Sequence, residues 1–118
     1  MNPYLILYIL FLHFIADFVL QSDAMAKSKS KHFDWLFVHC LVHFASYFFG
    51  LLLVFDMNQA ALFAGITFFA HLLTDAITSR INGKLYALES KHWFFVGIGA
   101  DQLSHAAQLI LTLHLISK

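Results

Sequence analysis

The sequence predicts an all-α integral membrane protein, a bundle of four transmembrane helices that run up, down, up and down. Hydrophobic residues make up 60% of the 118 residues and charged residues only 12%, whereas soluble domains contain about 45–50% and 25%. Four apolar segments each approach the ~20 residues that a helix needs to cross the hydrocarbon core. Short polar connections separate them and favour antiparallel neighbours, and the length favours one domain over residues 1–118.

The first apolar segment, at about residues 3–22, is interpreted as a retained helix. It differs from a secretion signal because no Lys or Arg precedes the apolar run and because the charged residue Asp17 lies inside it. The remaining segments cover about residues 33–55, 60–79 and 93–116. Each is predicted to form one membrane-spanning helix.

The basic residues predict how the helices are oriented. Six of the seven Lys and Arg residues lie in the connections at 22–32 and 79–92. By the positive-inside rule these two connections are cytoplasmic. Both termini and the turn at 55–59 are therefore expected on the non-cytoplasmic side.

Charge and cysteine content narrow the classes of function. The formal net charge is zero, and the chain has a single cysteine, Cys40. A neutral chain without a basic arm or a Cys-rich finger gives no direct evidence for a nucleic-acid partner. One cysteine excludes an internal disulfide bond and a Cys-rich metal knuckle. The polar residues inside the apolar segments are then the main indication of function.

Three acidic residues deep within the apolar segments, Asp17, Asp75 and Asp101, each have a histidine four residues away. Residues four apart share one face of a helix, and at ~1.5 Å rise per residue all these positions fall within about three turns of one another in depth. They lie in the cytoplasmic half of the predicted membrane region, so we expect one cluster. Its members are the pairs His13 and Asp17, His71 and Asp75, and Asp101 and His105, together with His39 and His43 of the second segment.

This cluster predicts a metal site. A buried carboxylate costs several kcal/mol unless it is paired, and a divalent cation would neutralise three of them together. His nitrogen and Asp oxygen are ligands that Zn²⁺ accepts. The set exceeds one tetrahedral shell, so two or three ions are expected. The predicted ligands are His13, Asp17, His39, His71, Asp75, Asp101 and His105, with His43 as a further candidate.

Other interpretations of the cluster stay open. The polar residues could lock the helices together by hydrogen bonds, or line a pathway in a transporter or channel for protons or divalent metals. A pathway should continue to both faces, and on the outer side the segments offer little beyond Ser46 and Thr67, which favours a one-sided site. A small interaction protein and a homo-oligomer also remain open.

A polar mouth is predicted at the cytoplasmic end of the first helix. Gln21 continues the stripe of His13 and Asp17 to the surface, beside the lysines of the first connection. The simpler interpretation is a helix end followed by a positively charged loop. The functional one is a site for an anionic substrate such as a phosphate group. Its candidate residues are Gln21, Lys27, Lys31 and Arg80.

The motifs resemble a known family. HFIADFVLQ, a Lys-containing connection, His39, HLLTD and DQLSH resemble a family of small, largely uncharacterised bacterial and phage four-helix membrane proteins over nearly the whole chain. That family distantly resembles inner-membrane metal-dependent hydrolases and the zinc-dependent phospholipase C and P1 nuclease group. The resemblance implies hydrolysis of a phosphoester by clustered metal ions in the bacterial inner membrane. It implies six metal ligands, at His13, Asp17, His71, Asp75, Asp101 and His105. His39 is a seventh.

The sequence thus predicts a membrane-embedded, zinc-dependent phosphoester hydrolase whose site opens to the cytoplasm. Asp17 or Asp101 would act as the base for a metal-bound water. A lipid head group is the preferred substrate, which makes membrane lipid and a phosphate-containing substrate the expected partners. A proton or divalent-metal transporter that uses the same cluster is the alternative.

Overall fold

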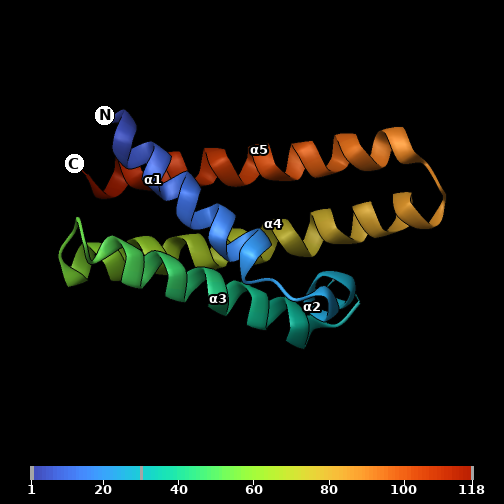
Figure 1. The fold of residues 1–118 in the computed structure, drawn as a ribbon, viewed down its shortest axis with the longest axis horizontal. Helices are drawn as coiled ribbons and strands as arrows, with labels where there is room; N and C mark the ends of the chain where they lie inside the picture. The colour runs from blue at the N-terminus through green and yellow to red at the C-terminus, as the bar shows by residue number, and fades with distance from the viewer. Residues whose placement is uncertain (1, 30, 118) are drawn as a thin grey trace.

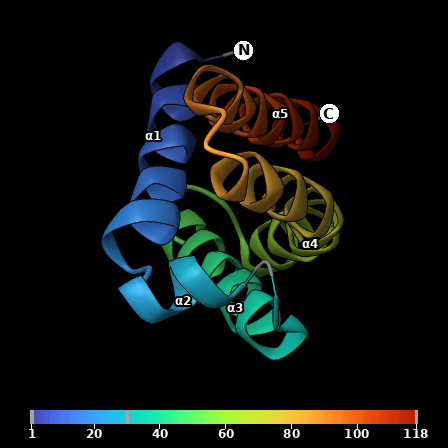
Figure 2. The ribbon, with the colours of Figure 1, turned by 90° about the vertical axis from the view of Figure 1, so that its right-hand side faces the viewer.

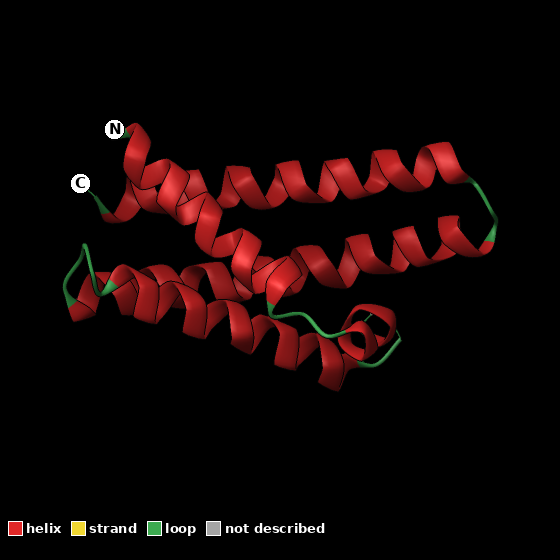
Figure 3. Ribbon diagram, in the orientation of Figure 1, coloured by secondary structure: helices red, strands yellow, loops and turns green. Residues whose placement is uncertain are grey.

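The computed structural model describes residues 2–29 and 31–117, without the side chains of residues 26 and 27. All the regular structure in these residues is helical (Figure 3), which confirms the predicted all-α class. The elements are α1 (Pro3–Phe14), a π-helical turn η1 (Ile15–Val19), α2 (Asp23–Ser28), α3 (Phe33–Leu51), α4 (Met57–Ala87) and α5 (Lys91–Ile116).

The four long helices alternate in direction (Figure 1). α1 and α4 run away from the end that holds both termini, and α3 and α5 run back toward it. α4 packs against α3 on one side and α5 on the other, while α1 is inclined across α3 and α5 (Figure 2). This arrangement brings η1 beside α3, so the end of the first helix joins the interior of the bundle.

The helix limits differ from the predicted segments where polar residues continue a helix. α4 extends to Ala87, eight residues beyond the predicted end at 79, and a Leu88–Ser90 connection follows in which Glu89 has φ of 56°. Hydropathy falls at Arg80, but a helix ends where its backbone is capped and not where it becomes polar. α4 and α5 therefore project together as a hairpin beyond the rest of the bundle (Figure 1).

The first connection contains a helix that hydropathy did not predict. Ser22 caps α2 by accepting a hydrogen bond from the backbone N–H of Met25 at 3.1 Å, and the Met25 side chain is buried. Serine is a favoured N-cap residue, and the buried methionine holds the short helix against the bundle. α2 lies beside the first turns of α3 (Figure 2).

The core and the exterior of the bundle differ from those of a soluble protein. Large apolar side chains are exposed on the outside of every long helix, among them Phe11, Phe37, Phe69 and Leu103. α3 and α4 are long and apolar enough to cross a membrane, and the segment Pro3–Val19 is a shorter apolar helix. The buried apolar cluster fills only the end that holds the termini. Its members are Ile9, Tyr47, Leu51, Ala60, Phe63, Ala64, Leu109, Leu113 and Ile116.

The crossing of α1 and α3 depends on a small residue. The Tyr8 hydroxyl donates to the Gly50 carbonyl at 2.6 Å, and a Cβ added at Gly50 would lie 2.7 Å from both Cδ atoms of Leu12. We expect Gly50→Val to lower the free energy of unfolding by about 1–3 kcal/mol, because the larger side chain forces the two helices apart. Thermal unfolding in detergent, followed by circular dichroism, measures the change.

The matched control is Gly65→Val in α4, where an added Cβ has no neighbour within 4 Å. If the Gly50→Val protein has the same melting temperature as the Gly65→Val protein, α1 does not cross α3 at this point.

Candidate metal centre

Asp17 reaches the interior because the first helix changes its winding. The backbone N–H of Leu20 donates to the carbonyl of Ile15 at 2.8 Å, which closes a π-helical turn. Such turns occur frequently at functional sites. Ala16 and Asp17 are the buried residues of this turn, and Asp17 therefore faces α3.

Two imidazoles of α3 meet the Asp17 carboxylate. The Nε2 atoms of His39 and His43 lie 3.1 and 3.4 Å from Asp17 Oδ1. Both histidines have no exposed surface, and they share a face of α3 because they are four residues apart. This is the contact between the first and second helices that the common depth of the residues predicts.

The Asp75 carboxylate on α4 is contacted from three helices. Its Oδ2 lies 3.2 Å from Nε2 of both His39 and His71, and its Oδ1 lies 3.1 Å from Nε2 of His105. A carboxylate that is 2% exposed must be stabilised by its neighbours, since burying its charge alone costs several kcal/mol. Asp75 thus lies where α3, α4 and α5 meet.

Three of these imidazole nitrogens face the carboxylates without making hydrogen bonds. Among the described residues, Nε2 of His39, His43 and His71 has no hydrogen-bond partner and is fully buried. Buried polar atoms without partners are rare and call for an explanation. With Zn–N and Zn–O distances of about 2.0–2.2 Å, two ligands of one tetrahedral ion lie roughly 3.3–3.5 Å apart. The observed N···O separations of 3.1–3.4 Å are close to that spacing, and three of the four are slightly shorter.

Six residues form two groups that could hold a metal ion. In each group the ligand atoms lie within 4.8 Å of one another, and His71 belongs to both. One group is Asp17, His39, His43 and His71, and the other is His71, Asp75 and His105. His43, which the sequence left as a further candidate, is thus placed among the first group.

Two predicted ligands, His13 and Asp101, border these groups. The His13 ring is hydrogen-bonded through Nδ1 to the Tyr47 hydroxyl and through Nε2 to Gln102 Oε1, both at 3.1 Å. Asp101 Oδ1 lies 3.1 Å from His105 Nε2 and accepts a hydrogen bond from the Thr78 hydroxyl. His13 Nε2 also lies 3.6 Å from Asp17 Oδ2, so each of the two residues contacts a member of the groups. Their role as ligands stays a prediction.

Sequence reasoning missed two side chains that connect the helices. Gln102 donates from Nε2 to Asp17 Oδ2 at 2.9 Å and to Asp101 Oδ2 at 3.2 Å. Tyr47 lies 3.1 Å from His13 and 3.4 Å from His43 through its hydroxyl. Tyr47 follows His43 by four residues, so extending the α3 stripe by one turn would have found it.

An open cleft of about 730 Å³ leads to the centre from outside. Asp17, Asp75 and Asp101 all line it, so the metal groups can be reached through it. Lys29 extends from the end of α2, and its Nζ lies 3.3 Å from Asp75 Oδ2. Gln102 and the predicted mouth residues Gln21 and Lys31 also line the cleft.

The remaining two predicted mouth residues are not part of this lining. Arg80 is exposed on α4, outside the described residues that line the cleft. The side chain of Lys27 lies outside the described part of the structure. Lys29, one of the three lysines of the first connection, is the lysine whose described side chain contacts a carboxylate of the centre, that of Asp75.

The other side of the cluster is nearly closed. A cavity of only about 10 Å³, the space of a single water molecule, lies beside His13, Tyr47 and His71. Beyond Tyr47, the apolar core fills the end of the bundle that holds the termini. The centre thus opens on one side only within the described residues.

The chain belongs to the family described as "Protein of unknown function (DUF3307)", which matches residues 5–118. No curated protein and no solved structure matches the chain. The comparisons support a small uncharacterised family over nearly the whole chain. The function therefore has to be argued from the site.

The two metal groups predict a specific pattern of metal loss. We expect His39→Ala and His105→Ala each to remove about one equivalent of zinc, and His71→Ala to remove both, because His71 is shared. Metal analysis of the detergent-purified protein by mass spectrometry measures the content. His114→Ala is the control, since His114 is exposed on α5. Wild type with no more zinc than His71→Ala would refute the site.

Proposed function

We propose that this protein is a membrane-embedded hydrolase of phosphoesters that uses two or three His/Asp-bound divalent ions, zinc in the first instance. The observation that carries the proposal is the set of buried, unpartnered imidazole nitrogens facing carboxylates beside an open cleft. Lys29, whose Nζ lies 3.3 Å from Asp75 Oδ2, adds a positive charge for an anionic substrate. The resemblance of the motifs to metal-dependent hydrolases points to the same chemistry.

The distribution of side chains supports a membrane location. Apolar residues cover the outside of the long helices while His and Asp lie inside, the reverse of a soluble bundle. The connections that contain six of the seven Lys and Arg residues lie at the end of the bundle where α2 and the α4–α5 connection are found (Figure 1). By the positive-inside rule that end is cytoplasmic, and the cleft then opens to the cytoplasm, as expected in the bacterial inner membrane.

The residues have separable roles in the proposed reaction. His39, His43, His71, His105 and the carboxylates of Asp17 and Asp75 would hold the ions, which supply Lewis-acid chemistry and a nucleophilic water at neutral pH. Asp101 lines the cleft outside the two metal groups. Its Oδ2 is oriented by Gln102, and its Oδ1 by Thr78. We therefore assign the base that receives a proton from water to Asp101 rather than Asp17.

The closed end of the bundle favours a hydrolase over a transporter. A pathway for protons or metals needs polar groups or water on both sides of the cluster. Here Leu51, Phe63 and Leu113, with at most 1% of their surface exposed, lie in the apolar cluster on the non-cleft side. This closed apolar end supports a site that substrates enter and leave through the same opening, the cleft.

The assigned base gives a prediction for catalysis. We expect Asp101→Asn to reduce kcat by about 10²–10⁴ while zinc content stays unchanged, because the proton acceptor is removed and the ligands remain. The assay follows hydrolysis of 4-nitrophenyl phosphate and bis(4-nitrophenyl) phosphate by the zinc-loaded protein. Asp34→Asn is the control, since Asp34 is exposed at the start of α3.

The same zinc-loaded protein distinguishes a hydrolase from a transporter. Zinc-loaded protein that hydrolyses neither ester, but that carries zinc across the membrane of liposomes, would replace the hydrolase by the transporter.

The proposed orientation predicts where cysteines are labelled. In a Cys40→Ala background, a membrane-impermeant maleimide should label Asn58→Cys in intact bacterial cells, because the start of α4 faces outward. Lys84→Cys, on the exposed surface near the other end of α4, should react only after the cells are permeabilised. Equal labelling of both positions in intact cells would contradict the orientation.

A further inference from the structure

The side-chain amide of Gln102 is oriented by the two carboxylates beside it. Its Nε2 donates to Asp17 Oδ2 at 2.9 Å and to Asp101 Oδ2 at 3.2 Å. The reversed amide would turn its oxygen toward two carboxylates, which only accept hydrogen bonds when ionised. Gln102 Oε1 therefore faces His13 Nε2, at 3.1 Å. Because a carbonyl oxygen only accepts, the ring proton of His13 lies on Nε2.

The position of this proton sets the direction of the next two hydrogen bonds. In a neutral imidazole the other ring nitrogen is an acceptor, so His13 Nδ1 accepts from the Tyr47 hydroxyl at 3.1 Å. A phenol has one proton, and toward His43 the Tyr47 oxygen can then only accept. That oxygen lies 3.4 Å from His43 Nδ1. The ring proton of His43 is therefore on Nδ1, and its Nε2 carries a free lone pair.

This lone pair of His43 points into the first metal group. His43 Nε2 lies 3.4 Å from Asp17 Oδ1, and it is buried without a hydrogen-bond partner among the described residues. Two acceptors that face each other with no proton between them suit a cation. A neutral imidazole nitrogen is the form that binds a metal ion, and the other ring nitrogen commonly donates to a group that fixes the tautomer. Here Tyr47 is that group.

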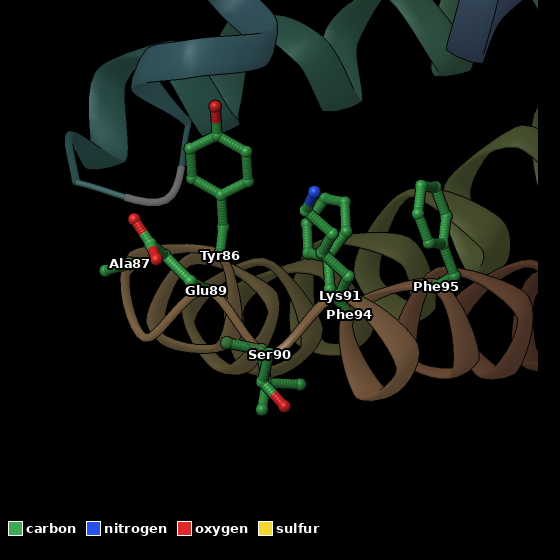
Figure 4. A pocket seen from close by; sticks show the side chains of 8 residues that line it. Tyr86, Ala87, Glu89, Ser90, Lys91, Phe94 and Phe95 are labelled. Atoms are coloured by element: carbon green, nitrogen blue, oxygen red, sulfur yellow. The ribbon is translucent and has the colours of Figure 1, made fainter.

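The hydrogen bonds of Tyr47 lie on the closed side of the centre. His13 and Tyr47 line the cavity of about 10 Å³ there, which has space for a single water molecule. The cleft on the opposite side shares Tyr86 with a hollow of about 720 Å³ at the α4–α5 connection (Figure 4), where the charged residues Glu89 and Lys91 are part of the lining. Water therefore reaches the centre from the cleft, whereas the protein itself supplies the partners of the Tyr47 hydroxyl.

We propose that Gln102, His13 and Tyr47 form a hydrogen-bond chain that fixes the tautomer of His43 and holds its Nε2 ready for a metal ion beside Asp17. His13 is then a positioning residue and not a ligand, because the chain uses both of its ring nitrogens. The value of this tautomer for catalysis rests on the proposed function. The tautomer itself does not, and it is measured separately.

Removal of one hydroxyl tests the effect of the chain on metal binding. In Tyr47→Phe the His43 proton loses its acceptor at Nδ1 and moves to Nε2, where Asp17 accepts it and where it competes with the metal. We expect the zinc affinity of the weaker-binding site to fall by about 10–100-fold, measured by competition with a chromophoric chelator in detergent. Tyr8→Phe is the matched control, since the Tyr8 hydroxyl donates to the Gly50 carbonyl away from the centre.

Nuclear magnetic resonance of ¹⁵N-labelled histidine rings reads the tautomer directly. In zinc-free wild type and Tyr8→Phe protein, the ring proton of His43 should be on Nδ1 and that of His13 on Nε2. In Tyr47→Phe protein the His43 proton should be on Nε2. The His43 signals are identified by their absence from His43→Gln protein. A role of Tyr47 in packing alone would leave the position of this proton unchanged.

The role of His13 is tested by combining variants. Without the His13 ring, the Tyr47 hydroxyl donates to His43 Nδ1 and drives the His43 proton to Nε2, so His13→Ala should weaken zinc binding about as much as Tyr47→Phe. The double variant should lose little more than either single variant, because both act through one chain. The zinc content at saturation should stay that of wild type, whereas the loss of a ligand lowers it.

The outcomes distinguish this proposal from the hydrolase. Zinc-binding protein in which Tyr47→Phe and Tyr8→Phe have equal affinities and the same His43 tautomer overturns the chain and leaves the hydrolase standing. Losses that add in the double variant, with less zinc at saturation, make His13 a ligand and also overturn it. Protein that binds no zinc, yet in which Tyr47→Phe moves the His43 proton, refutes the hydrolase and supports the chain.

Discussion

The structure depends on the burial of negative charge where its helices meet. Asp17 and Asp75 are at most 5% exposed, and imidazoles from α3, α4 and α5 surround them. Carboxylates this close repel one another and lose hydration, so a positive partner has to be present. Removing one partner of such a cluster leaves the others uncompensated, which links the packing of the helices to occupancy of the centre.

Part of the site could be predicted because it is periodic. The His–Asp pairs lie four residues apart, and equal depth in the segments is enough to bring His39, Asp17 and Asp75 together. The π-helical turn that directs Asp17 inward has no simple sequence signature. The contacts of Gln102 with Asp17 and Asp101 depend on how α1 and α5 are rotated, and hydropathy carries no information on that rotation.

The fold, like the site, could be predicted only in part. Apolar segments identified the four long helices, because burial and lipid exposure both require apolar side chains. They did not identify the last eight residues of α4 or the short helix α2, which are polar and are held by capping and by contact with neighbouring helices. Hydropathy indicates whether a segment lies in water or in an apolar environment. The residue at which a helix ends depends instead on the groups that form hydrogen bonds with its terminal N–H and C=O groups.

These unpredicted polar segments are also the ones that shape access to the centre. The apolar segments supply all six residues of the two candidate metal groups, but Lys29 comes from the end of α2 and Tyr86 from the extension of α4. Lys29 contacts Asp75 directly, so the charge at the entrance and the charge of the centre are coupled. A cation at the centre weakens the hold of Asp75 on Lys29 and makes the ammonium available to an anion. In the proposed site, metal binding therefore prepares the entrance for a phosphate, and the order of binding would be metal first and substrate second.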